Sequence, residues 1–186
     1  MASNVPTIVA ALREALALVP GQRVFGVVDA AQCVDLAYEA KLQYGKEIRS
    51  LFLPEVQTKL WDVAPYLVPI DVDSGYLENW ARRWGTNAGV LLVTAADEDA
   101  LYEHLRKVFV VEDEEGQEYF FRYYDPRVLR TFLPTCSGGQ LAEFFGSVDE
   151  LIVEAGELDS SIRFRREGDQ LAMIVICLTE PPGVAR

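Results

Sequence analysis

The stretch AGVLLVTAADEDALYEHLRKVF, residues 88–109, joins a buried strand to an amphipathic helix. Its first part, residues 88–95, is almost entirely apolar and predicts a strand in the interior of a sheet. The second part, residues 97–109, has acidic residues in its first turn and Arg106 and Lys107 in its last turn, as the helix dipole favours. A buried strand followed directly by a helix is typical of the α/β class.

The same alternation of strands and helices extends toward the N-terminus. We predict a helix over residues 8–19, a strand over 24–28, a helix from 29 to about 44, a strand over 66–71 and a helix over 74–85. The segment Asp29–Gln32 matches a capping box, which places the start of the second helix at Asp29. Because Pro69 has no amide hydrogen, its strand is expected to lie at a sheet edge or to end near that residue.

Downstream of the opening stretch, residues 110–124 predict two strands joined by an acidic turn around Gly116. Strict alternation would place Phe120, Arg122 and Tyr124 on one face of the second strand. The pair Asp125–Pro126 then predicts a helix start, since Asp is a favoured N-cap and Pro suits the first helical position. The short helix that follows is expected to end at Pro134.

From residue 147 onward the pattern changes to short strands, with a turn at EGDQ, residues 167–170, and a final apolar strand. We therefore predict an α/β fold in which helices flank a mixed β-sheet. An α/β domain is expected over residues 1–146, with a small β-rich C-terminal appendage over residues 147–186. The chain of 186 residues is long enough to bury a core without metals or disulfides.

The charge of the chain argues against nucleic acid as a partner. Asp and Glu number 29 against 17 Lys and Arg, which gives a formal net charge of −12. Such a chain repels phosphate backbones, and it suits either a basic partner or simple solubility. The N-terminus has no basic leader region, and Arg13–Glu14 interrupts its apolar stretch. We expect a cytoplasmic protein that has no membrane contact.

A search for catalytic and metal-binding motifs finds none. The three cysteines, Cys33, Cys136 and Cys177, are widely spaced, and His104 is the only histidine, so a zinc site lacks ligands. Phosphate-binding loops, dinucleotide-binding fingerprints and nucleophile elbows are absent. We predict no catalytic residues, no metal and no cofactor, and hence a protein that is not an enzyme.

The candidate site residues each have a structural and a functional interpretation. Arg122 lies among aromatic residues and needs a carboxylate, which Asp29 or Asp71 at strand ends would supply, or else it contacts a ligand or partner. The tryptophans of the helix over 74–85 form either core or a protein-binding surface. The full set of residues assigned to partner binding or to a structural signature is Asp29, Trp80, Trp84, Arg122, Tyr124, Asp125 and Arg127.

Several segments together resemble one bacterial family. They are GVVDA, YLVPID, NWARRWG, GVLLVTA, LRKVFVVEDEEG, YFFRYYDPRVLRTFLP and EFFGSVDELIVE, in this order. The chain is thereby similar, over about residues 24–154, to the effector adaptors, or effector chaperones, of type VI secretion systems. The FFRYYDPRVL segment is the most specific mark, and FFG at residues 144–146 is a second. The resemblance implies a non-catalytic protein that binds a toxin effector in the cytoplasm and delivers it to the VgrG spike protein.

Two other functions stay open from the sequence. The net charge suits an immunity-type protein that neutralises a basic toxin, because electrostatic steering speeds such encounters. Acidic residues at strand ends, namely Asp29, Asp71 and Asp125, would suit a metal-dependent enzyme.

Overall fold

A computed structural model of the chain describes residues 5–52, 59–112, 115–157 and 159–178. Its helices are α1 (Val5–Ala15), α2 (Val34–Tyr44), α4 (Gly75–Arg82), α5 (Glu98–Phe109), α6 (Pro126–Phe132) and α7 (Gly138–Phe145), with 3-10 turns η1 (Gly45–Glu47) and η2 (Leu133–Thr135). Its strands are β1 (Arg23–Asp29), β2 (Arg49–Ser50), β3 (Pro65–Ile70), β4 (Gly89–Thr94), β5 (Val110–Glu112), β6 (Glu118–Phe120), β7 (Glu150–Glu154), β8 (Ser160–Glu167) and β9 (Gln170–Cys177).

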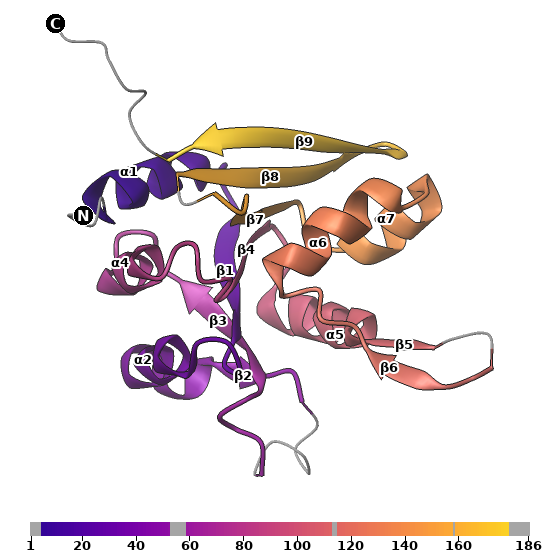
Figure 1. Cartoon of the computed structure of the whole chain (residues 1–186), viewed down its shortest axis with the longest axis horizontal. Helices are drawn as coiled ribbons and strands as arrows, with labels where there is room; N and C mark the ends of the chain where they lie inside the picture. The colour runs from indigo at the N-terminus through magenta and orange to yellow at the C-terminus, as the bar shows by residue number, and fades with distance from the viewer. Residues whose placement is uncertain (1–4, 53–58, 113–114, 158, 179–186) are drawn as a thin grey trace, which may run out of the picture.

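A seven-stranded sheet with the order β2-β3-β1-β4-β7-β8-β9 lies between two layers of helices. Helices α1, α2 and α4 cover one face, and α5, α6 and α7 cover the other (Figure 1). Strands β5 and β6 form a separate two-stranded hairpin beyond the end of α5. The predicted α/β class with helices flanking a sheet is confirmed. None of the helices in the described part of the chain combines the length and hydrophobicity needed to cross a bilayer.

Every described strand pair is antiparallel, whereas the sequence suggests a mixed sheet. Strands β3 and β4 both pair with β1, one on each side. The connection through α4 therefore passes over β1, so that β3 and β4 are parallel to each other without being neighbours. An alternation of strands and helices along the chain does not reveal that a third strand lies between the two.

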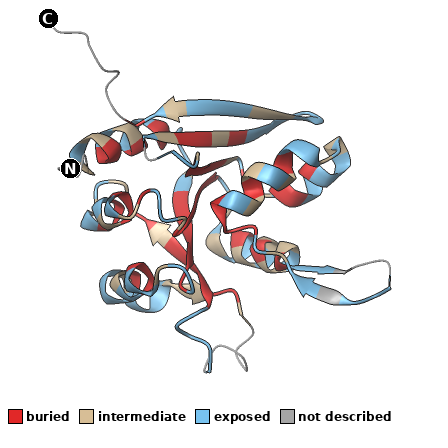
Figure 2. Ribbon diagram, in the orientation of Figure 1, coloured by how far each residue is buried: buried red, intermediate tan, exposed pale blue. Residues whose placement is uncertain are grey.

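Strand β1 shows how the sheet supplies both cores. Val24 and Val28 face the layer of α1, α2 and α4, whereas Phe25 and Val27 face the layer of α5, α6 and α7. This alternation is the period of two expected of a strand that is covered on both faces. Figure 2 shows the central strands buried along their length. At Gly26 the Trp80 ring lies so close that an added Cβ would be 2.5 Å from it.

Two local predictions are wrong, for physical reasons. The capping box at Asp29–Gln32 does not start a helix, because α2 begins at Val34 and the Asp29 carboxylate pairs elsewhere. Strand β6 ends at Phe120 and does not continue to Tyr124. Beyond it the backbone turns, with hydrogen bonds from Tyr123 N to the Phe121 carbonyl at 2.9 Å and from Asp125 N to the Arg122 carbonyl at 3.0 Å.

The C-terminal strands continue the main sheet. Strand β7 pairs with β4, β8 with β7 and β9 with β8. The predicted β-rich character of this segment and its turn at EGDQ are confirmed, and Gly168 in that turn has a φ of +61°. Because β7 lies directly beside the central strand β4, this segment shares the buried core with the strands before it.

Candidate functional site: an aromatic groove beside an ion-pair network

The segment that follows the hairpin is held to the end of the sheet by an ion pair. Arg122 Nη2 donates to Asp29 Oδ2 at 2.6 Å, and the Asp29 side chain is only 1% exposed whereas that of Arg122 is 46% exposed. The hydrogen bond to Asp29 raises the pKa of Arg122. The carboxylate interpretation of Arg122 is thus confirmed for Asp29, which connects the last residue of β1 to the turn before α6.

Asp125 caps α6 as the sequence predicts. Its Oδ1 accepts a hydrogen bond from the Arg127 amide at 2.9 Å, and Pro126 occupies the first helical turn. The Arg127 side chain also donates to both carboxylate oxygens, with Nη2 at 2.7 Å from Oδ2. Burial acts to raise the pKa of Asp125, but these hydrogen bonds outweigh it and the net shift is downward.

A third buried acid is Glu154 at the end of β7, and the sequence analysis does not identify it as a candidate. Its Oε2 accepts from the Asn87 amide at 2.8 Å, and Arg130 of α6 donates to its backbone carbonyl. Burial raises the pKa of the Glu154 carboxyl. No motif marks this residue, because its partners are backbone groups distant in the sequence. Together with the two pairs above, it fixes the segment 121–130 against one end of the sheet.

Replacing Arg122 with methionine should lower the free energy of unfolding by about 2 kcal/mol, because Asp29 is left buried without its partner. This loss of stability is smaller than that for a fully buried ion pair, because water reaches the Arg122 side chain. Urea denaturation of Arg122→Met, Asp29→Asn and the double variant measures the coupling. We expect the double variant to lose less stability than the two single losses added together; strict additivity would contradict the ion pair's role.

The stability of this segment should also depend on alkaline pH through Tyr124. Burial first, and the nearby Asp29 carboxylate second, raise the pKa of Tyr124 from 10.0 to about 12. A raised tyrosine pKa gives full stability below about pH 10 and loses it as the pH rises toward 12. Chemical denaturation from pH 9 to about pH 12 should therefore show a shallower loss for Tyr124→Phe than for the wild type. If the free energy of unfolding falls equally steeply with pH in both proteins, Tyr124 does not contribute to the alkaline loss of stability.

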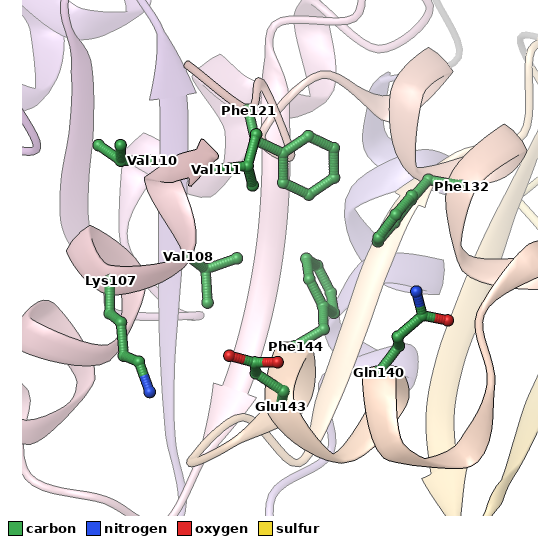
Figure 3. Close-up of a pocket in the computed structure, with 9 residues that line it drawn as sticks. All are labelled: Lys107, Val108, Val110, Val111, Phe121, Phe132, Gln140, Glu143 and Phe144. Atoms are coloured by element: carbon green, nitrogen blue, oxygen red, sulfur yellow. The ribbon is translucent and has the colours of Figure 1, made fainter. Parts of the chain in front are cut away.

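An apolar groove of about 750 Å³ lies beside this ion-pair network. Three phenylalanines form its floor, with ring centroids 4.7 Å apart for Phe121 and Phe132, 5.9 Å for Phe132 and Phe144, and 6.3 Å for Phe121 and Phe144. Figure 3 shows these three rings pointing toward one another from separate segments of the chain. The lining residues are Lys107, Val108, Val110, Val111, Phe121, Phe132, Gln140, Glu143 and Phe144.

The groove is open to a partner along the β5–β6 hairpin. Val110 and Val111 line it and are 39% and 43% exposed, and across the hairpin Tyr119 and Phe120 are 52% and 67% exposed. The hairpin connection carries the sequence EDEEGQE, so acidic residues belong to the same segment as the exposed apolar ones. An apolar floor with the Glu143 carboxylate in its lining suits an apolar segment that carries a Lys or Arg.

The other candidate residues lie away from this groove. Trp80 and Trp84 are buried, 1% and 6% exposed, in the opposite layer. Asp71 follows β3 at the opposite end of the sheet from Asp29, because β3 is antiparallel to β1 and pairs Pro65 with Asp29. The three strand-end acids are therefore not brought together. Within the described residues no group of three His, Cys, Asp or Glu side chains is placed to hold a metal ion.

Comparison with known proteins finds a matching family model. A family model described as "Domain of unknown function (DUF4123)" matches residues 24–143, which is more than half of the chain. The matched range includes the Asp29–Arg122 pair, the capped helix α6 and most of the groove. No curated protein and no solved structure matches the chain significantly.

Proposed function

Because the chain belongs to the family described as Domain of unknown function (DUF4123), we propose that it is a non-catalytic adaptor of a type VI secretion system. In this proposal it binds a toxin effector in the cytoplasm and loads it onto the VgrG spike protein. The resemblance of its ordered segments to effector adaptors supports the assignment. The observation that carries it is the groove itself, an open apolar surface to which the segment that most resembles that family contributes Phe121 and Phe132.

The groove favours protein binding over a purely structural role. Aromatic side chains in a partly exposed pocket are the usual anchors of protein interfaces. Here the rings of Phe121, Phe132 and Phe144 are held by their own helices and by the anchored turn, so they are ordered before any partner arrives. A groove formed in advance lowers the conformational cost of binding.

The chemistry of the groove also limits what it binds. We infer an amphipathic segment of the effector whose apolar side chains enter the groove and whose Lys or Arg residues face Glu143. Attraction between exposed charges is screened at high ionic strength, so binding to the effector should weaken as salt is added. This preference is consistent with the net charge of −12.

The proposal is tested by recovering the tagged chain from its own bacterium while the secretion genes are expressed. Mass spectrometry should find a VgrG spike protein together with a toxin, and the toxin should stay active when the chain is added to it. Recovery of a toxin without a spike, with its activity inhibited, would instead establish the immunity function that the acidic charge suggests. Specific stabilisation by Mg²⁺, Mn²⁺ or Ca²⁺ in a thermal-shift assay would favour the metal-dependent enzyme.

A further inference from the structure

Within the described part of the chain, strand β9 is an open edge of the main sheet. It is the last strand in the sheet order and pairs only with β8 among the described strands (Figure 1). The helical layers do not cover its middle, where Met173, Ile174 and Val175 are 49%, 45% and 69% exposed. Figure 2 shows this strand as largely exposed, in contrast with the central strands.

The backbone of β9 presents hydrogen-bonding groups to this open edge. Leu178 N donates to the Asp159 carbonyl at 2.7 Å, in the register that pairs Cys177 with Ser160. In an antiparallel ladder, bonded and non-bonded pairs alternate, so the even-numbered residues of β9 bond to β8. The backbone groups of Leu171, Met173 and Val175 therefore point away from β8. An extended strand is the partner whose backbone complements these groups.

The composition of β9 lacks the usual protection of an edge strand. Its sequence QLAMIVIC has no charge and no proline over eight residues, although the whole chain carries a net charge of −12. Natural edges are normally protected by Lys, by Pro, by bulges or by being short. The opposite edge of this sheet illustrates the last device, because β2 has only two residues. An unprotected apolar edge is expected to have a partner.

We propose that β9 pairs with β9 of a second copy of this chain, antiparallel and about a twofold axis perpendicular to the sheet. Pairing an edge with itself closes the assembly, and a twofold axis centred on Met173 sets Leu171 opposite Val175 of the partner copy. These residues are apolar, so the strand offers a second copy a contact without the repulsion between carboxylates that acidic surfaces impose. The neighbouring strand β8 carries Arg163, Arg165 and Arg166 and adds no excess of negative charge.

The dimer is independent of the proposed function and has its own thermodynamic signature. A single strand pair buries less than the ~800 Å² per partner of a standard interface, so we expect a dissociation constant in the micromolar range. Two acidic chains repel each other at long range, and salt screens this repulsion. Dimerisation should therefore strengthen with added salt, whereas binding of a basic effector segment at the groove should weaken.

Sedimentation velocity of the full chain from ~1 to ~300 µM tests the pairing. We expect a shift from the mass of one 20.8 kDa chain toward that of two copies. Val175→Pro removes a backbone donor of the open edge while the bonds of β9 to β8 are kept. Val175→Lys places a positive charge at the contact between the two β9 strands. Each should weaken dimerisation at least ~10-fold, whereas Val175→Thr, which keeps the amide and the β-branched shape, should not.

A second readout follows the backbone directly. Amide exchange measured by NMR should slow for Leu171, Met173 and Val175 as the protein concentration rises. A monomer at all concentrations would overturn the proposal. So would a dimer that Val175→Pro and Val175→Lys both leave intact, since that dimer must use another surface.

Discussion

Replacing Gly89 with alanine is expected to destabilise the protein by about 3 kcal/mol or more. Gly89 is the first residue of β4 and has a φ of +156°, and an added Cβ would lie 2.1 Å from the carbonyl oxygen of Val27 in β1. The clash is with backbone, so no side chain can rotate to relieve it. Relief would require separating β1 from β4, the two central strands on which both cores are built.

The matched control is Gly139→Ala. Gly139 lies in the first turn of α7 and has no atom within 4 Å of an added Cβ. Alanine is a better helix former than glycine, so this change should be neutral or stabilising by up to about 1 kcal/mol. Urea denaturation of both variants measures the two changes in the free energy of unfolding. Equal stability of Gly89→Ala and the wild type would contradict the register of β1 and β4.

Replacing Val111 with lysine is expected to weaken binding to the effector at least ~10-fold without unfolding the protein. Val111 lines the groove and is 43% exposed, so a longer charged side chain is accommodated in the free protein. In the complex the lysine would be desolvated against apolar groups and would face the basic residues of the partner. Isothermal titration calorimetry with the effector recovered alongside the chain measures the loss.

The control for this variant is Leu42→Lys, an equal change of chemistry at a 69% exposed residue. Leu42 belongs to α2, which covers the opposite face of the sheet from the groove (Figure 1). Its effect on affinity should stay within about threefold. If both variants bind as tightly as the wild type, the effector uses another surface, and if both lose binding, α2 also contributes to the interface.

The local features of this fold could be predicted because they depend on neighbouring residues. The strand over 88–95 and the helix over 97–109 are recovered as β4 and α5, nearly to the residue. The Asp125–Pro126 helix start is likewise recovered. In each case the signal is a run of apolar residues or a cap that contacts an amide two or three positions away.

The features that escaped prediction depend on distant contacts. Asp29 heads a segment that matches a capping box, yet its carboxylate binds Arg122, 93 positions further along the chain. The antiparallel order of β3, β1 and β4 is set by a connection that passes over a strand. The groove combines Phe121 from a turn, Phe132 from the end of α6 and Phe144 from α7, and no periodicity links these residues.

The most direct test is export of the effector by a bacterium whose own gene for this chain has been deleted. The wild type and Leu42→Lys should restore secretion of the effector. Val111→Lys should fail to do so at the same cellular level of protein, because the effector no longer enters the groove. Normal export in the deletion strain, or equal restoration by Val111→Lys, would contradict the proposal that this chain loads an effector through its aromatic groove.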